Sequence, residues 1–414
     1  MYDRWFRHIL ARKMAQPYVH ILFGARQTGK STLLNDLVPE DALRIDLSDP
    51  VQRADIAARP AELQAMCRAL PRRKGGSTVL IDEAQTVPAV FDTIQYLYDH
   101  DPGRWRFILC GSSARRLRSS GTNLLPGRSI LHRLYPLVAA ELSVQGASQL
   151  DSLKNVALKW PDSKTPAEPF PAMELLDRLA FGALPGIVTA PVSVRPDLLR
   201  TYTVVHLEEE IRHEAFVRDW AAFMRFARLA AAESGNMINF ASISNQAGIS
   251  QPTVKAYYQL LEDMFVGFMV PAFTRSPRKN ILSTPRFFMF DLGVRNAAAG
   301  VLPSRETVMA NPGPLFEQWV GMELWNRLQY LGDGRLYYQK TRTGAEVDFI
   351  VERGNRLLPI EVKWTEHPTA GDARHLLTFL REHPHEADEG FIVCRCARPL
   401  RLDDMVTAVP WQWL

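Results

Sequence analysis

Apolar runs alternate with amphipathic stretches along the first third of the chain. The segments 18–23, 78–82 and 106–111 are continuous apolar or β-branched runs, and a helical pattern follows each of them. Buried strands that alternate with helices are typical of a parallel sheet whose strands are joined by crossover helices. The pattern therefore predicts an α/β domain, built on a parallel sheet, over residues 1–150.

The rest of the chain divides into three further parts. Residues 151–235 begin with a polar, proline-containing stretch, which indicates an irregular insertion, and continue with a helical pattern that predicts a helical lid. Residues 236–300 show short helices followed by two strand-like runs. Residues 301–414 open with one long amphipathic helix and continue as strands with a second helix among them, so we predict a separate α/β domain.

Composition narrows the class of protein only slightly. The chain has 414 residues, 46% of them hydrophobic, and a formal net charge of +4, which is compatible with nucleic acid but points to it weakly. Cys67, Cys110, Cys394 and Cys396 lack zinc-ligand spacing, so we expect reduced core thiols. No stretch approaches the ~20 apolar residues of a membrane span. We therefore expect a soluble, cytoplasmic protein with no membrane contact.

The first chemical motif is a glycine-framed loop between a predicted strand and a predicted helix. Its residues match G-x-x-x-x-G-K-[ST], and the strand "VHILF" and the helical stretch "KSTLLNDLV" flank it. Such a loop curls backbone N–H groups around phosphate at a helix N-terminus. We expect Lys30 to reach the β- and γ-phosphates and Ser31 to bind Mg²⁺. The predicted nucleotide-binding residues are Gly24, Ala25, Arg26, Gln27, Thr28, Gly29, Lys30, Ser31 and Thr32.

Two further strand ends carry polar residues that suit nucleotide hydrolysis. The buried run in "TVLIDEAQ" ends in Asp82 and Glu83. Asp82 is placed to hold Mg²⁺, and Glu83 can orient and deprotonate the attacking water. The run "RFILCGSS" ends in Ser112 and Ser113, either of which could touch the γ-phosphate or serve as a helix N-cap.

These motifs resemble those of the AAA+ ATPases. The resemblance implies ATP and Mg²⁺ as cofactors and puts Ser112 or Ser113 at the sensor-1 position. It also implies an arginine that acts on the nucleotide of a neighbouring subunit, for which Arg128 is the first candidate and Arg133 the second. An arginine finger in trans requires an oligomer, so a ring, possibly a hexamer, is expected.

The resemblance narrows to a bacterial and archaeal family that adds a C-terminal domain of formerly unknown function to this ATPase module. The motifs "GARQTGKSTLL", "LIDEAQ", "ILCGSSARRL", "GR…LYPL…EL" and "GALPG" follow one another as in that family. The family implies a winged helix in the middle of the chain, and the pattern over residues 236–300 also looks like one.

The winged helix predicts contact with DNA, mainly through phosphates. Its second helix would present Gln251, Thr253, Lys255 and either Tyr258 or Gln259, a set with a single cation. The segment after it holds Arg275, Arg278, Lys279 and Arg286 without an acid, which suits phosphate contact. The alternative is a winged-helix scaffold that packs subunits together and carries a solvated basic loop.

The C-terminal part contains a second set of candidate catalytic residues. Asp348 lies in one predicted strand, and Glu361 and Lys363 lie on one face of the next, as in the PD-(D/E)xK nucleases that this pattern resembles. Such a set can hold a divalent cation, Mg²⁺ or Mn²⁺, and activate water. Glu317, or less favourably Glu323, would be an extra acid on the preceding helix. The alternative is a restriction-endonuclease-like fold kept for gripping DNA or for assembly.

Three functions are consistent with these features. The main interpretation is a Mg²⁺-dependent AAA+ ATPase that remodels or translocates DNA, with branched DNA such as four-way (Holliday) junctions as a reasonable substrate class. The first alternative is an ATP-regulated endonuclease. The second is a nucleotide switch that binds a protein or DNA partner and turns over slowly.

Overall fold

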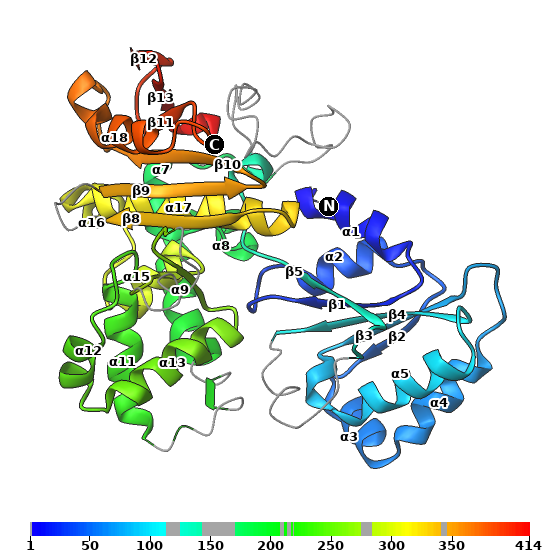
Figure 1. Cartoon of the computed structure of the whole chain (residues 1–414). Coiled ribbons are helices and arrows are strands. Elements are labelled where there is room, and N and C mark those ends of the chain that lie inside the picture. Colours follow the sequence, from blue (N-terminus) through cyan, green and yellow to red (C-terminus); the bar gives the residue numbers. More distant parts are fainter. Residues whose placement is uncertain are drawn as a thin grey trace.

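The computed structural model describes residues 2–112, 125–142, 170–207, 211–212, 217, 219–274, 284–340 and 346–414 (Figure 1). Most of the predicted insertion lies outside these ranges. So do four of the predicted site residues: Ser113, Arg275, Arg278 and Lys279. No helix in the described ranges has both the length and the apolar character needed to cross a membrane.

A five-stranded parallel sheet forms the centre of the N-terminal domain. Its strands are β1 (Val19–Phe23), β2 (Leu43–Asp46), β3 (Ser77–Asp82), β4 (Trp105–Gly111) and β5 (Ser129–Arg133), in the order β2-β3-β4-β1-β5. The three continuous apolar runs of the sequence are β1, β3 and β4. Strand β2 was not predicted because only one of its four side chains, Ile45, is buried, so it has no apolar run.

Helices cover both faces of this sheet, as the crossover pattern predicts. The helices α1 (Trp5–Met14) and α2 (Lys30–Leu37) pack on one face, and α3 (Pro50–Ala58), α4 (Pro60–Ala69) and α5 (Ala89–His100) pack on the other (Figure 1). Because alternate residues of a strand point to opposite faces, each strand contributes to both cores. In β1, for example, Ile21 joins the core under α5 and Leu22 joins the core under α2.

A helical part connects the N-terminal domain to the rest of the chain. It contains α7 (Leu175–Phe181), α8 (Pro185–Thr189), α9 (Arg195–Thr201), a π-helix (Tyr202–Leu207) and α11 (Trp220–Ala232). The predicted turn at 182–186 ends inside α8, because Pro185 occupies the first helical position, where its missing N–H costs no hydrogen bond.

The next unit has the predicted order of helix, turn, helix and two strands. Helix α12 (Phe240–Ala247) ends at Gly248, whose φ of 70° is left-handed, and Ser250 caps α13 (Gln251–Asp263) by accepting from the Thr253 N–H at 3.3 Å. Strands β6 (Gly267–Val270) and β7 (Arg286–Met289) then pair antiparallel. Helices α15 (Leu292–Ala298) and α16 (Arg305–Ala310) follow and pack against α7.

The C-terminal domain is built on a mixed six-stranded sheet. Its strands are β8 (Arg335–Lys340), β9 (Glu346–Arg353), β10 (Arg356–Val362), β11 (Gly390–Cys394), β12 (Leu400–Asp403) and β13 (Val406–Pro410), in the order β12-β13-β11-β10-β9-β8. The long helix α17 (Pro312–Leu331) packs on one face, and α18 (Arg374–Glu382) packs on the other. Strands β12 and β13 were not predicted.

Helix α17 also joins the C-terminal domain to the ATPase-like sheet. Its last turns lie beside α1 in Figure 1, where Tyr330 stacks on Phe6 with ring centroids 4.7 Å apart. The Tyr330 hydroxyl accepts from the Tyr135 N–H at 3.0 Å, and the Glu323 carboxylate accepts from the Ala139 N–H at 2.7 Å. The two domains therefore share a buried, hydrogen-bonded contact just after β5.

Candidate nucleotide site at the edge of the parallel sheet

The predicted phosphate loop connects β1 to α2 at the carboxyl edge of the sheet. A side chain at Gly24 would place its Cβ 2.3 Å from the Leu134 carbonyl oxygen, so the close approach of β5 requires glycine there. Gly29, directly before α2, has a φ of 90°, which L-residues with a side chain rarely adopt. The two glycines of the motif are therefore needed for the shape of the loop.

Lys30 lies under the loop and bonds to its backbone. Its Nζ donates to the carbonyl oxygens of Gly24 at 2.8 Å and Ala25 at 2.9 Å, and the residue is only 6% exposed. This places a cation where the loop would surround an anion. Ser31 and Thr32 are exposed at the first turn of α2, so the Ser31 hydroxyl could bind a cation held together with phosphate.

Two other side chains, neither predicted from the sequence, support the loop from outside. Arg4 is 5% exposed and donates to the Thr28 carbonyl at 2.6 Å, while its Nε donates to the Glu141 carboxylate at 2.7 Å. The Tyr202 hydroxyl donates to the Arg26 carbonyl at 3.3 Å. Carbonyl oxygens repel phosphate, so bonding them to these donors leaves the backbone N–H groups of the loop to meet an anion.

The predicted acids stand at the same edge of the sheet, at the end of β3. Asp82 and Glu83 are both half-buried, and the Glu83 N–H donates to the Asp82 carboxylate at 2.9 Å. Burial raises the pKa of the Cys110 thiol well above its ordinary value, the charge of Asp82 raises it further, and the charge of Lys30 opposes this rise. Lys30 and Asp82 therefore both lie close to the end of β4, as a phosphate and Mg²⁺ site requires.

Gln85 is a polar residue at this edge to which the sequence analysis gave no role. It lies in the short 3₁₀ turn η1 (Ala84–Thr86), directly after the acids, and it is 3% exposed. Its amide nitrogen donates to the Glu83 carboxylate and, at 3.2 Å, to the Ser112 hydroxyl. The available signal was a polar residue two positions after the candidate base.

The two candidate arginine fingers lie at opposite ends of strand β5. Arg128 precedes β5, next to the start of β1, so it is on the far side of the sheet from its own phosphate loop; its guanidinium pairs with Asp99 at 2.6 Å. Arg133 ends β5 beside Phe23, at the loop edge, and stacks over Phe265 with 5.2 Å from Cζ to the ring centroid. Of the two, only Arg133 lies at the end of β5 that adjoins the phosphate loop.

The predicted DNA-contacting residues of α13 are placed as expected with one exception. Gln251, Lys255 and Gln259 are exposed and Thr253 is half-buried, with Lys255 over the Phe240 ring at 5.3 Å. The exception is Tyr258, the alternative to Gln259: it is 2% exposed and packs against the rings of Phe226 and Phe287, because its position on α13 faces the core of the unit.

The prediction that Arg286 contacts DNA phosphate is wrong. Arg286 is the first residue of β7, is 6% exposed, and pairs with Glu317 at 2.7 Å and with Glu346. Both terminal nitrogens of the guanidinium bond to carboxylates and the side chain is buried, so Arg286 does not present its charge to a phosphate at the surface. The sequence concealed this because both carboxylates lie more than thirty residues further along the chain.

The C-terminal candidate site brings its predicted residues together. Strands β9 and β10 pair antiparallel, and the Asp348 carboxylate accepts from the Val362 N–H at 2.8 Å. Glu361 is 5% exposed, and its carboxylate accepts from the Lys363 ammonium at 2.6 Å. Burial, reinforced by the charge of Asp348, raises the pKa of both Glu317 and Glu361 to about 7.

Two of these acids already have cationic partners within the protein. Arg286 pairs with Glu317 and Lys363 pairs with Glu361, while burial raises the pKa of both carboxyl groups to about 7. Within the described ranges, no three His, Cys, Asp or Glu side chains are grouped so that they could hold a metal ion. Glu323 is used elsewhere, in the bond to Ala139 and an ion pair with Arg327. The second divalent cation at this site stays a prediction.

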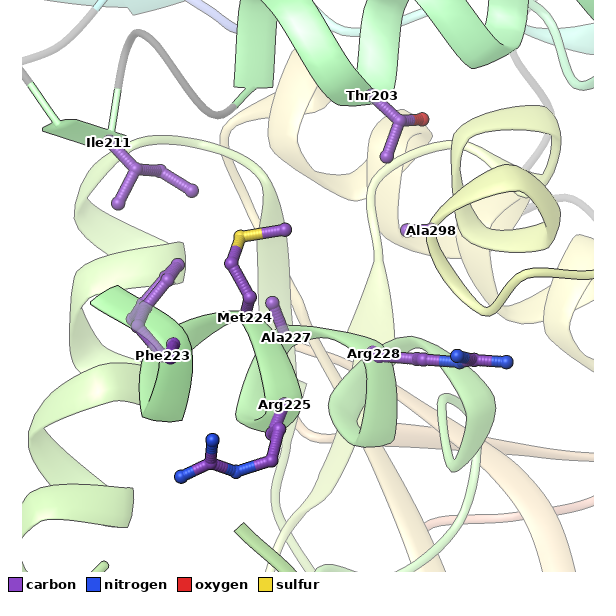
Figure 2. Close-up of a pocket in the computed structure, with 9 residues that line it drawn as sticks. Thr203, Ile211, Phe223, Met224, Arg225, Ala227, Arg228 and Ala298 are labelled. Carbon is purple, nitrogen blue, oxygen red and sulfur yellow. The ribbon is translucent and has the colours of Figure 1, made fainter. Parts of the chain in front are cut away.

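A pocket of about 300 Å³ lies apart from both sites. Figure 2 shows Phe223, Met224 and Arg228 of α11 beside it, with Thr203 and Ala298 on the elements across from them. The residues that line it are mostly apolar, with Arg225 and Arg228 among them, and include no acid.

Comparison with known families divides the chain into three matched parts. Residues 16–143 match the AAA domain family, residues 173–305 match a domain of unknown function, DUF8612, and residues 312–414 match another, DUF4143. The N-terminal match covers the phosphate loop and the β3 acids. It supports an ATPase of the AAA class in this part of the chain.

Similar proteins are found in bacteria. An uncharacterised protein of Mycobacterium tuberculosis is 26% identical over 364 residues, which are 87% of this chain and 73% of that protein. An uncharacterised protein of Haemophilus influenzae is 23% identical over 83% of this chain and 82% of its own length.

Solved structures give weaker matches. Domain III of the replication initiation protein DnaA from Thermotoga maritima is 14% identical, with a TM-score of 0.25, over 51% of this chain and 87% of that one. A STAND signal-transduction ATPase from Pyrococcus horikoshii is 12% identical, with a TM-score of 0.25, over 78% of this chain and 48% of that one. Such TM-scores do not establish a common overall fold.

Proposed function

We propose that this protein is a Mg²⁺-dependent ATPase that couples hydrolysis to the remodelling or translocation of DNA. One observation carries the proposal: Lys30, Asp82 and Glu83 meet at the carboxyl edge of one parallel sheet, where the phosphate loop has its carbonyls bonded to internal donors. Ligands of open α/β sheets bind outside the carboxyl ends of the strands.

Each residue of this edge has a role in the proposed hydrolysis. The loop N–H groups and Lys30 bind the phosphates, and Ser31 with Asp82 holds Mg²⁺, which binds with ATP and so needs few protein ligands. Mg²⁺ supplies charge neutralisation on the phosphate oxygens. Glu83 orients the attacking water and accepts its proton. The half-buried position of Glu83 is compatible with access to water.

The DNA part of the proposal rests on the middle unit. The proposal treats helices α12 and α13 with the paired strands β6 and β7 as a winged helix, and Lys255 stands exposed on α13. This unit touches the nucleotide edge, because Phe265, between α13 and β6, stacks on Phe23 with ring centroids 5.8 Å apart. A change in the loop after Phe23 could therefore move the DNA-contacting unit.

A ring oligomer is part of the same proposal. Arg128 lies at the edge of the sheet opposite its own phosphate loop, so it can complete a nucleotide site only in a neighbouring subunit. It would have to leave its ion pair with Asp99 to do so. Light scattering with and without ATP measures whether the wild type and the Arg128→Ala variant assemble. An ATPase assay on the same samples measures whether the assembled variant has lost hydrolysis.

The decisive experiment is the steady-state ATPase rate of the purified chain. We would compare no DNA, single strands, duplex and four-way junctions, with Lys30→Ala as the blank. Stimulation of about tenfold or more by one DNA form would support a DNA motor and name its substrate class. Equal rates with every DNA form would overturn the coupling to DNA.

A nucleotide switch is the second candidate. The buried contact of α17 with the segment after β5 favours it, since Tyr330 and Glu323 bond directly to the backbone beside the nucleotide edge. A switch predicts slow hydrolysis that DNA does not change. It also predicts different hydrogen exchange of α17 with ATP and with ADP, which a comparison of the two states would measure.

A further inference from the structure

Gln85 connects two strand ends of the nucleotide edge. Its side-chain nitrogen donates to the carboxylate of Glu83, which follows β3, and to the hydroxyl of Ser112, which follows β4. A carboxylate can only accept hydrogen bonds, so the amide must present its NH₂ group to Glu83. The direction of this bond follows from chemistry alone.

The strand order shows where the hydrogen bond between Gln85 and Ser112 lies relative to the phosphate loop. Strand β4 lies between β3 and β1 in the sheet, and β1 leads into the phosphate loop. A bond from the end of β3 to the end of β4 therefore draws the Glu83 carboxylate toward the loop. A base that activates water for attack on the γ-phosphate must face in that direction.

The surroundings hold Gln85 in one position. A Cβ at Gly111 would lie 2.4 Å from the Gln85 side-chain oxygen, so only glycine leaves room for the amide. Glu83 itself has a φ of 51°, a left-handed conformation that a residue with a side chain keeps only when its surroundings enforce it. In the described part of the chain, no donor bonds the buried Gln85 oxygen. The nitrogen contacts therefore set the orientation of the amide.

We propose that Gln85 is a positioning residue that holds Glu83 in the orientation for hydrolysis; this rests on the proposed ATPase function. In the reaction, water adds to the γ-phosphorus while the bond to the bridging oxygen breaks, one water proton passes to Glu83, and ADP and phosphate are released. Gln85 exchanges no proton. It fixes the carboxylate, which would otherwise rotate freely at the end of β3.

The experiment compares Gln85→Ala and Gln85→Asn with the wild type. Because a displaced base loses about 10²-fold in rate for an ångström of misplacement, we expect kcat of Gln85→Ala to fall about 10- to 100-fold. KM and the affinity for a fluorescent ATP analogue should change less than about threefold, because the hydrogen bonds of the Gln85 amide go to Glu83 and Ser112. Gln85→Asn keeps the NH₂ group and should recover part of kcat.

Three further variants separate positioning from a general loss of structure. Gln95→Ala, on the neighbouring helix α5, is the matched control and should hydrolyse ATP at the wild-type rate. Gly111→Ala would displace the Gln85 amide and should reproduce the loss seen with Gln85→Ala, even if one of the Gln85 variants folds poorly. In a Glu83→Gln background, Gln85→Ala should cause little further loss, since it acts through Glu83.

The outcomes are distinguishable. A wild-type protein without ATPase activity would contradict the proposed function itself. A wild type that hydrolyses ATP, with Gln85→Ala equally fast or faster, would overturn only the role of Gln85. An equal loss of nucleotide affinity and kcat would also overturn it, because that pattern indicates a damaged loop.

Discussion

Two acidic sites stand at sheet ends of this protein, and their charges are arranged in opposite ways. In the N-terminal domain, Asp82 and Glu83 are half-buried, and the nearby Lys30 bonds to loop carbonyls. In the C-terminal domain, Glu361 is buried and Lys363 bonds to it directly. At the N-terminal site, the lysine bonds to backbone carbonyls. At the C-terminal site, the lysine forms an ion pair with an acid of the site itself.

The difference teaches that residue types alone do not make a reactive site. Both sites have two acids and a lysine in the order that their motifs require. A buried carboxylate that is already neutralised offers less to a metal ion than one whose charge is unpaired, because the ion must displace the internal partner. We therefore expect nucleotide chemistry at the N-terminal site and mainly structural use of the C-terminal one.

The largest expected difference is in ATPase rate. Lys30→Ala should lower kcat by about 10²-fold or more, because it removes the cation that meets the developing charge on the phosphates. Asp348→Asn should leave the rate within about twofold. Steady-state assays on both variants measure this. A loss of activity in Asp348→Asn comparable to that in Lys30→Ala would break the comparison.

For stability, in contrast to ATPase rate, we expect the larger effect from the C-terminal site. Arg286→Met should lower the free energy of unfolding by about 2–4 kcal/mol, because it leaves Glu317 and Glu346 without their shared buried cation. The control is Arg353→Met, whose partner Asp333 is exposed, with an expected loss below about 1 kcal/mol. Urea unfolding measures both. If the two variants lose equal stability, the Arg286 contacts are not buried ion pairs.

The pH dependence of stability should locate the buried acids. Burial raises the pKa of Glu361 to about 7 in the folded state, above its value in the unfolded chain. The folded protein therefore holds this proton more tightly, and the resulting contribution to the free energy of unfolding is complete only below the pKa of the unfolded chain. The contribution is lost as pH rises through about 7. From pH 6 to 8.5, the wild type should lose about 1–2 kcal/mol more than Glu361→Gln. The exposed Glu366→Gln serves as control and should follow the wild type. Thermal unfolding across this pH range measures the difference, and identical curves for Glu361→Gln and wild type would contradict it.

The smallest expected effect concerns DNA. Lys255→Ala should weaken duplex binding about two- to fivefold and lower the slope of log affinity against log salt by about 1, as for one lost phosphate contact. Lys363→Ala, at the paired acidic site, should leave DNA affinity unchanged. Fluorescence anisotropy over a salt series measures both. A stronger effect from Lys363 would place the DNA at the C-terminal site instead.

Much of the fold could be predicted because its signals are local. Strands β1, β3, β4, β8 and β11 are apolar or alternating runs, and Gly248 with Ser250 marks the turn between α12 and α13. Strands β2 and β12 could not be predicted, since they are short and half-exposed and so lack a run. Tyr258 lies four residues after Val254 and three before Leu261, so the helical spacing places it on the buried face of α13. The rings that cover it come from α11 and β7.

The sequence by itself determined the phosphate loop, its flanking strand and helix, and the acids at the end of β3. All of these are contiguous motifs whose geometry depends on neighbours in the chain, such as the glycines at 24 and 29. Only the tertiary structure decided which charged side chains pair with one another and which remain available to bind a ligand. Arg286 meets Glu346 sixty positions away, and Ala139 meets Glu323 across 184 positions. Pairing of charges depends on distance in space, and no local pattern records it.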